Sequence, residues 1–305
     1  MPHLAVIIVS WNVRGLLTAC LRSLLADLDG VEHTADVWVV DNASVDGTAE
    51  MVAQAFPDVH LIACDDNLGF VKANNLALRR VIDRPTLKYV WLLNPDTEVQ
   101  PGATAALIQA LESGPRVGMA GPRLLNPDGS LQHSAFHFPG LVQLAIDLFP
   151  FPARWYDTRL NGRYPRAFYQ RETPFLIDHP LGASMMVRAG AIAEVGLMDE
   201  DFFMYCEEVD WCWRMKEAGW QILCAPTALV IHHAGQSSSQ VRVSSFVNLW
   251  KSRARLYARH YGPLKRRLAS ALVQVGMVLR RRKASPDMAQ ACREIVHVWR
   301  EAASQ

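Results

Sequence analysis

Residues 4–10 read LAVIIVS, and this stretch decides the fold class of the chain of 305 residues. Six consecutive apolar residues, four of them β-branched, predict a strand that is buried on both faces of a sheet. Leucines at helical spacing follow over residues 15–28, and strand and helix patterns go on alternating up to residue 93. This alternation predicts an α/β fold with a mostly parallel sheet and helices on both of its faces.

The remaining sequence divides into stretches of different pattern. In the first hundred residues, further strands are expected at 37–40, 59–63 and 89–93, and helices at 48–56 and 71–81. Residues 128–180 are rich in proline, aromatic residues and histidine, and we expect loops and short strands there. Beyond them, a strand is expected at 181–187, a helix at 206–218, and strands at 221–223 and 228–231.

Each of the first four predicted strands ends in polar residues. The carboxyl ends of parallel strands meet at one edge of a sheet, and ligands bind there in folds of this type. The polar residues at these ends are Ser10-Trp11-Asn12, Asp41-Asn42, Asp65-Asp66-Asn67 and Asn94-Pro95-Asp96. No G-x-G-x-x-G motif follows the first strand and no G-x-x-x-x-G-K-[ST] motif occurs, which disfavours a dinucleotide dehydrogenase and a P-loop NTPase.

Three groups of residues can carry chemistry. Asp96 follows a buried strand, where a carboxylate can bind a divalent cation that bridges a diphosphate, although Asn-Pro-Asp is also an ordinary turn sequence. Glu207, Glu208 and Asp210 lie between aromatic residues, and clustered acids in apolar surroundings suit a general base. The first turn of a helix also attracts acids without any catalytic role. His232 ends an apolar run and can complete a metal site with a carboxylate.

The charge of the chain is unevenly distributed. Residues 1–240 carry 17 Lys and Arg against 27 Asp and Glu, whereas residues 241–286 carry 12 Lys and Arg and no acid. Apolar residues recur there at helical spacing, at Leu264, Leu268, Leu272, Val275 and Leu279, and basic clusters lie near both ends, at Lys265-Arg266-Arg267 and Arg280-Arg281-Arg282-Lys283. Such a helix fits the headgroup region of an anionic membrane. Packing on the catalytic domain or on a second subunit is the alternative, and both stay open.

Composition narrows the class of protein further. Half of the residues are hydrophobic and one fifth are charged, which excludes a disordered chain, a collagen-like repeat and a small disulfide scaffold. The six cysteines form no C-x-x-C pair and no zinc spacing, so we expect a reducing, cytoplasmic location. The apolar run at 4–9 is too short for a signal peptide, and no segment is long enough to span a bilayer.

Seven motifs of the chain resemble those of family 2 glycosyltransferases. In chain order they are VIIVSWN at 6–12, VVDNASVDGT at 39–48, NLGF at 67–70, LLNPDTEV at 92–99, LGASMMVRAGAIAEVG at 181–196, DEDFFMYCEEVDWCWRMKEAGW at 199–220 and IHHAGQSS at 231–238. Their order and spacing over residues 4–240 are more specific than any one of them. The nearest branch is the rhamnosyltransferase-like group that builds bacterial cell-surface polysaccharides.

The resemblance implies a GT-A fold, a nucleotide-sugar donor, a divalent metal (Mn²⁺ or Mg²⁺) and inversion at the anomeric carbon. It also implies a GT-A catalytic domain over residues 1–240, with a nucleotide-sugar half at 1–100 and a metal and acceptor half at 101–240. Residues 241–305 would then be a basic, helical C-terminal extension. That extension would bring the enzyme to a lipid-linked acceptor on the inner face of the cell membrane.

The resemblance also assigns individual residues. The nucleotide-sugar residues carried over are Asn12, Asp41, Asn67, Asn94 and Asp96, and the metal ligands are Asp96 and His232. Asp41 resembles the aspartate that binds the base of the nucleotide. Asn94 stands where the family has the first Asp of its D-x-D motif, and an amide is a poorer cation ligand than a carboxylate.

The catalytic carboxylate of the family is the second residue of a Glu-Asp pair, which falls on Glu208. Here Glu replaces Asp and is one methylene longer, so Asp210 is kept as a second candidate and Glu207 as a neighbour that orients the base. The base would take a proton from an acceptor hydroxyl while that oxygen attacks C1 of the donor sugar. One displacement of this kind inverts the anomeric centre.

Two other functions stay open at this stage. A sugar-phosphate nucleotidyltransferase would need a Gly-rich, basic loop after the first strand, which residues 10–15 lack. The second open function is that of a non-catalytic relative that binds sugar or membrane. It stays open because Asn94 and Glu208 depart from the family pattern. Nucleic acid is not expected as a partner, since few aromatic residues interrupt the basic stretch. The sequence leaves open which sugar is transferred and whether the donor is a dTDP- or a UDP-sugar. It also leaves open the acceptor and whether the chain forms a homo-oligomer.

Overall fold

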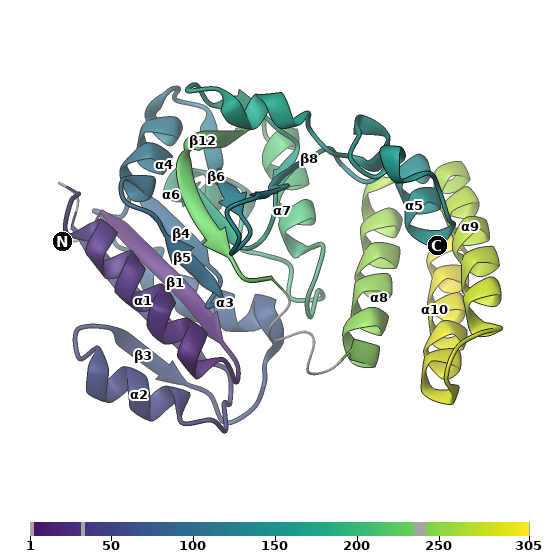
Figure 1. Cartoon of the computed structure of the whole chain (residues 1–305), viewed down its shortest axis with the longest axis horizontal. Helices are drawn as coiled ribbons and strands as arrows, with labels where there is room; N and C mark the ends of the chain where they lie inside the picture. Colours follow the sequence, from purple (N-terminus) through teal and green to yellow (C-terminus); the bar gives the residue numbers. More distant parts are fainter. Residues whose placement is uncertain (1–2, 32–33, 235–241, 305) are drawn as a thin grey trace.

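The computed structural model describes residues 3–31, 34–234 and 242–304, which form one mixed sheet with helices on both faces and a separate group of helices beside it (Figure 1). The strand order is β3 (His60–Ala63), β2 (Ala35–Asp41), β1 (Leu4–Ser10), β4 (Tyr89–Leu93), β11 (Ser184–Arg188), β6 (Val117–Leu125), β12 (Gln221–His232) and β5 (Thr97–Val99). Strands β1 to β4 are parallel, and β6 and β12 run in the same direction because β11 is antiparallel to both β4 and β6. The predicted mostly parallel α/β sheet is confirmed.

The helices cover both faces of this sheet, as the sequence predicts. One face carries α1 (Arg14–Leu28), α2 (Thr48–Ala55) and α4 (Ala103–Glu112), and the other carries α3 (Gly69–Val81), α6 (Ala189–Val195) and α7 (Glu207–Glu217). Along β1, Ala5 and Ile7 join one apolar cluster while Leu4, Val6 and Ile8 join the other. The LAVIIVS run is therefore buried on both faces because each face has its own layer of helices.

Strand register brings the polar strand ends together. The β1–β2 pairing sets Ser10 opposite Asp41, and the β2–β3 pairing sets Asp41 opposite Ala63. The loops that follow these strands therefore leave the sheet side by side at its carboxyl edge. This register is what allows residues from different loops to form one site.

Two sequence-based expectations need correction. The predicted strands at 221–223 and 228–231 are one strand, β12, whose pairing with β6 shifts between Ala225 and Leu229. Pro226 lies in that interval, and a proline has no N–H to donate to the ladder. The 128–180 stretch contains the predicted short strands β7 (Leu131–Gln132), β8 (Ala135–Phe136), β9 (Phe175–Leu176) and β10 (His179–Pro180), but also a helix that we did not expect, α5 (Leu141–Leu148). Three short 3₁₀ helices follow it, at Ala153–Trp155, Arg159–Asn161 and Arg166–Gln170.

The C-terminal region is helical, with α8 (Arg242–His260), α9 (Pro263–Arg281) and α10 (Pro286–Ser304) standing beside the sheet domain (Figure 1). These helices share a hydrophobic cluster with α5, and its members include Leu144, Trp250, Tyr257, Val273 and Trp299. The proposed domain boundary between residues 240 and 241 lies outside the described residues. No helix in the described part of the chain is both long enough and apolar enough to cross a membrane.

Candidate active site

The loop after β1 is fastened to the loop after β2 through Asn12. The backbone N–H of Asn12 donates to Ser44 Oγ at 2.9 Å, and Asn12 Oδ1 accepts from the backbone N–H of Val45 at 2.8 Å. Asn12 has a φ of 53°, a left-handed conformation that asparagine tolerates better than most residues. This candidate nucleotide residue is therefore held rigidly at the carboxyl edge of the sheet.

Asp41 ends β2 and is buried with one oxygen unsatisfied. Its Oδ2 accepts from the backbone N–H of Ser44 at 3.2 Å, whereas its buried Oδ1 has no hydrogen-bond partner within the described residues. A buried carboxylate oxygen without a donor is costly, so a ligand N–H would be stabilising there. Next to it, the Asn42 side chain donates to Asn67 Oδ1 at 2.9 Å and accepts from the Leu68 N–H at 2.8 Å. Three predicted nucleotide residues therefore lie on neighbouring, mutually bonded loops.

The glycine of the NLGF motif lets the nucleotide side contact the loop before α7. Gly69 has a φ of +77°, and a Cβ there would lie 2.6 Å from a ring carbon of Phe203. The backbone N–H of Phe70 donates to the Phe203 carbonyl at 2.9 Å. Any side chain at position 69 would push these two segments apart, so the glycine is required for their close approach.

The predicted metal ligands Asp96 and His232 lie together. Antiparallel pairing of β5 with β12 sets His232 opposite Thr97, so that His232 Nε2 is 3.4 Å from Asp96 Oδ1. Both side chains are almost fully buried, and Asp96 Oδ1 has no hydrogen-bond partner among the described residues. In the same part of the chain, no group of three or more His, Cys, Asp and Glu could hold a metal ion. A cation site here, as the sequence predicts it, would take its protein ligands from this pair.

Gln132 sets the orientation of the His232 ring. The amide Nε2 of Gln132 donates to Asn126 Oδ1 at 3.0 Å, which leaves its carbonyl Oε1 facing His232 Nδ1 at 2.7 Å. A carbonyl oxygen only accepts, so Nδ1 carries a proton, and in the neutral ring Nε2 then presents a lone pair towards Asp96. A lone pair facing an unsatisfied carboxylate oxygen fits a divalent cation, with Gln132 as the outer partner that metal-binding histidines usually have. The Asn94 backbone N–H donates to the Ala183 carbonyl at 2.8 Å, which fixes the loop beside this pair.

The first turn of α7 holds two carboxyl groups that favour the protonated form. Burial raises the pKa of Glu208 to about 7, and burial together with the charge of Glu208 raises the pKa of Glu207 well above its ordinary value. Glu207 Oε2 is buried without a hydrogen-bond partner within the described chain, and Glu208 lies against Gly182. A carboxyl whose pKa lies near neutrality suits general base catalysis, because it is partly ionised yet still basic.

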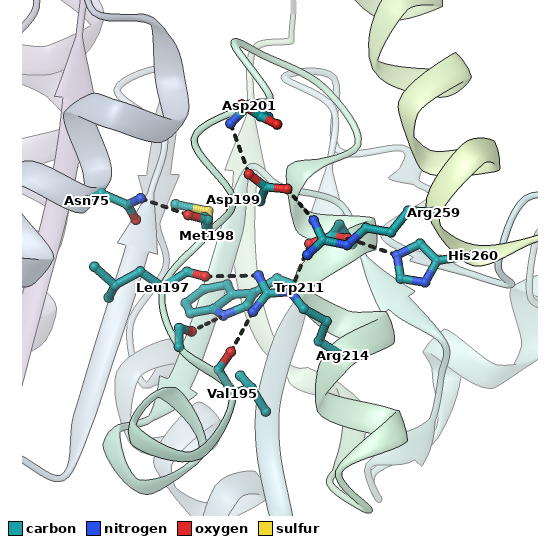
Figure 2. A network of polar contacts seen from close by, with 12 residues as sticks. Asn75, Val195, Leu197, Met198, Asp199, Asp201, Trp211, Arg214, Arg259 and His260 are labelled. Carbon is teal, nitrogen blue, oxygen red and sulfur yellow. Dashed lines mark hydrogen bonds and ion pairs between the residues drawn. The ribbon is translucent and has the colours of Figure 1, made fainter. Parts of the chain in front are cut away.

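Asp210, in the same helical turn, has the opposite character. It accepts from Arg214 Nε at 2.9 Å and from His260 Nε2 at 2.8 Å, and Arg259 Nε lies 3.4 Å away. Figure 2 labels these three partner side chains. Burial by itself would raise the pKa of Asp210, but these hydrogen bonds and positive charges lower it. A carboxylate held by two guanidinium groups and an imidazole N–H is a poor proton acceptor. The arrangement favours Glu208 over Asp210 as the base.

The structure also adds residues that the sequence did not point to. Gln132 lies in a stretch expected to be loops and short strands, Arg259 counted only towards the basic charge of the C-terminal region, and His260 was part of no motif or charge count. Their partners are 50 to 100 residues away in the chain, so no local pattern could have identified them. No hydrogen bond or ion pair joins the α7 acids to Asp96 or His232 in the described structure. The part of the IHHAGQSS motif from Gly235 onwards lies outside the described residues.

Comparisons with known proteins bear on these observations. The family model described as glycosyl transferase family 2 matches residues 5–196. The N-acetylglucosaminyl-diphospho-decaprenol L-rhamnosyltransferase of Mycobacterium tuberculosis (strain H37Rv) is 32% identical over 235 residues, which cover 72% of this chain and 74% of the relative. The low-salt glycan biosynthesis hexosyltransferase Agl10 of Haloferax volcanii is 24% identical over 287 residues, or 92% of this chain and 85% of the relative.

Solved structures show the same fold. The mannosyltransferase PcManGT of Pyrobaculum calidifontis, in complex with GDP-Man and Mn²⁺, has a TM-score of 0.53 at 16% identity and covers 99% of this chain and 86% of its own. GalNAc-T7 with UDP, GalNAc and Mn²⁺ has a TM-score of 0.55 at 15% identity; the match covers 76% of this chain but only 43% of GalNAc-T7. At such low identity the likeness concerns the fold alone, which is GT-A.

Proposed function

Because the chain belongs to glycosyl transferase family 2, we propose that it is an inverting enzyme that moves a sugar from a dTDP- or UDP-sugar to a hydroxyl of a lipid-linked glycan. The name of the mycobacterial relative identifies a diphospho-polyprenol acceptor and a rhamnosyl group, and we propose substrates of that class here. The observation that carries the proposal is the first turn of α7, where Glu208 has a pKa near neutrality while Asp210 is committed to cations.

Glu208 is the proposed general base. Its carboxylate would take the proton from the acceptor hydroxyl as the oxygen attacks C1 of the donor sugar and the bond to the nucleoside diphosphate breaks. Beside it, burial and the neighbouring charge both raise the pKa of Glu207, because each opposes the ionisation of its carboxyl group. A single displacement with one base gives inversion at C1.

Asp96 and His232 would hold the divalent cation, and Gln132 would keep the histidine in the tautomer that binds it. Bound Mn²⁺ or Mg²⁺ supplies positive charge to the diphosphate leaving group. The unsatisfied Oδ1 of Asp41 would accept from the ring N–H that uracil and thymine share, which supports a pyrimidine donor without distinguishing the two. Asn12, Asn67 and Asn94 would line the same pocket.

The outer face of α9 is the proposed membrane contact, which would put the enzyme on the cytoplasmic side of the cell membrane. One side of the helix is buried, and it carries Ala269, Val273 and Met277. On the other side, Leu264 is 74% exposed and Val275 is 54% exposed. The exposed apolar residues of this helix are Leu264, Leu268, Val275, Val278 and Leu279. Arg267, Arg281, Arg282 and Lys283 flank them without a carboxylate partner in the described chain. Apolar residues with basic flanks match a headgroup region.

A substrate screen tests the proposed function. Purified enzyme is incubated with a panel of dTDP- and UDP-sugars, with and without Mn²⁺, and with and without an N-acetylglucosaminyl-diphospho-prenol acceptor. We expect cation-dependent transfer from one donor, slow donor hydrolysis without acceptor, and an inverted linkage in the product. In a parallel incubation with added pyrophosphate, conversion of the donor to a nucleoside triphosphate and a sugar phosphate would indicate a nucleotidyltransferase instead. Binding without turnover of any donor would indicate a non-catalytic relative.

A further inference from the structure

The turn that leads into α7 is strained. Tyr205 and Cys206 have φ values of 71° and 64°, and two consecutive non-glycine residues in the left-handed region are unusual. Such a conformation is unfavourable for a residue with a side chain and persists only where the surrounding structure enforces it. Glu207 and Glu208 follow this turn directly, so whatever holds the turn also decides where the two carboxyl groups lie.

Helix α8 supplies contacts on both sides of the strained turn. Before it, Ser252 Oγ donates to the Met204 carbonyl at 2.8 Å. After it, His260 Nε2 donates to Asp210 Oδ1 at 2.8 Å, and Arg259 pairs with both Asp210 and Asp199 (Figure 2). The strained turn is therefore held at its two ends by one helix of the C-terminal region.

The His260 ring has little freedom to move. It is stacked on Trp213 with ring centroids 4.5 Å apart and planes 19° apart, and Trp213 is stacked in turn on Phe138 at 4.1 Å. The His260 side chain is 4% exposed and Asp210 is 0% exposed, so water cannot replace this hydrogen bond. A buried carboxylate needs such partners, because removing one leaves part of its charge uncompensated.

The loop before the turn is connected to the same contacts. Asp199 Oδ1 accepts from the Asp201 N–H at 3.0 Å, while its Oδ2 pairs with Arg259. On the other side of this loop, Asn75 of α3 donates to the Met198 carbonyl at 2.8 Å (Figure 2). Arg259 therefore pairs with a loop that is also bonded to α3 in the nucleotide-sugar half of the chain.

We propose that Arg259 and His260 are positioning residues, which act through Asp210 to hold the first turn of α7 and its base Glu208 in the geometry for sugar transfer. This inference rests on the proposed function, in which Glu208 is the base. It makes the C-terminal helices part of the active site, because α8 carries both positioning residues and packs on α10, which packs on α9. Helix α9, which is proposed to contact the membrane, would then be connected through α10 and α8 to the first turn of α7.

Two variants of His260 separate positioning from general stability. His260→Phe keeps an aromatic ring against Trp213 but removes the N–H that Asp210 accepts, whereas His260→Gln keeps an N–H donor. Arg253→Gln is the matched control on the same helix, since it breaks the 2.7 Å ion pair with Asp147 of α5, and no ion pair joins Arg253 to a carboxylate of α7 in the described structure. We expect His260→Phe to lower kcat roughly 10- to 100-fold with donor KM changed less than about twofold, since small misplacements of a catalytic group have effects of this size. His260→Gln should recover much of the loss, and Arg253→Gln should retain kcat at a similar Tm.

Hydrogen exchange gives a readout that needs no turnover. The amides of residues 207–211 should exchange faster in His260→Phe than in Arg253→Gln, because only the first variant frees the start of α7. Unchanged exchange there, or a loss of kcat that follows Tm equally in both variants, would overturn the inference. So would faster exchange combined with normal kcat. If the wild-type enzyme turns over no donor but shows the exchange difference, the proposed function fails and the role of His260 in holding α7 stands.

Discussion

The nucleotide edge of the sheet and the first turn of α7 are built in different ways. At the nucleotide edge, Asn12, Asp41 and Asn67 are held by backbone and side-chain groups of the neighbouring loop, all within the first hundred residues. In α7, Asp210 is held by residues from α8, about 50 positions further along the chain. A site made of adjacent strand ends can be inferred from sequence patterns, whereas a site made by a distant helix cannot.

The same contrast recurs within one helical turn. Glu208 and Asp210 are two residues apart, yet burial raises the pKa of Glu208 to about 7, while hydrogen bonds and positive charges lower the pKa of Asp210 despite its burial. The cause of the difference is the presence of Arg214, Arg259 and His260 at one carboxylate and not at the other. Tertiary contacts, rather than residue type, therefore separate the proposed base Glu208 from the ion-paired carboxylate of Asp210.

Substitution of Glu208 should have the largest effect. Glu208→Gln keeps size and hydrogen bonding but removes proton acceptance, so we expect kcat to fall roughly 10²–10⁴-fold while donor and cation affinity are kept. Steady-state kinetics and calorimetric binding of the nucleoside diphosphate measure the two quantities. Glu207→Gln should cost less. A Glu208→Gln enzyme with near-normal transfer, beside an inactive but folded Asp210→Asn enzyme, would reverse the assignment.

The two carboxylates should also have opposite effects on stability as pH changes. Because the pKa of Glu208 is raised, this residue contributes fully to stability only at a pH below the ordinary pKa of a glutamate. That contribution is lost as the pH rises through about 7. Glu208→Gln should therefore be more stable than wild type at pH 8 and little different at pH 4. The lowered pKa of Asp210 means that its contribution is present at neutral pH and is lost on acidification.

Removal of the buried Asp210 carboxylate should be costly at neutral pH. Asp210→Asn should lower the free energy of unfolding by roughly 3–5 kcal/mol at pH 7, as expected when one partner of a buried ion pair is removed. Urea unfolding of both variants between pH 4 and 8 tests this pair of predictions. Parallel pH profiles for the two variants would contradict the assigned difference between Glu208 and Asp210.

Substitution of Gln132 should weaken cation-dependent binding, with an effect smaller than that of Glu208→Gln on kcat. Gln132→Ala frees the His232 ring and its tautomer, so cation-dependent binding of the nucleoside diphosphate should weaken roughly 10- to 100-fold. Titration calorimetry with and without Mn²⁺ measures this, and Asp96→Ala, which removes a ligand, is the reference for complete loss. If wild-type affinity is the same with and without the cation, the assignment of Asp96 and His232 is wrong.

The smallest effect is expected on the outer face of α9. Arg281→Gln and Arg282→Gln should each weaken binding to anionic vesicles by roughly 1 kcal/mol, and added salt should reduce the difference. Vesicle sedimentation measures the affinity, with Arg80→Gln on the exposed surface of α3 as the matched control. Vesicle binding that is equal in all variants, together with a dimer in solution, would assign this face to a second copy of the chain.

The sequence by itself determined the elements whose pattern is local. The apolar run at 4–10, the leucines at 15–28 and the acidic helix at 206–218 correspond to β1, α1 and α7 within a residue or two. The polar ends of the first strands followed from the same patterns, because parallel strands bring their carboxyl ends to one edge. The motifs then identified which of these polar residues resemble a nucleotide-sugar site.

Only the tertiary structure decided what depends on contacts between distant segments. It joined two predicted strands into β12, formed α5 against the C-terminal helices, and brought Gln132 to His232 and His260 to Asp210. Periodicity and capping report on interactions a few residues apart, whereas burial and ion pairing depend on which helices meet after folding. The pKa of Glu208 and that of Asp210 are properties of this packing. Residue type and helical spacing do not distinguish the two carboxylates, and before the structure only the motif resemblance ranked Glu208 above Asp210.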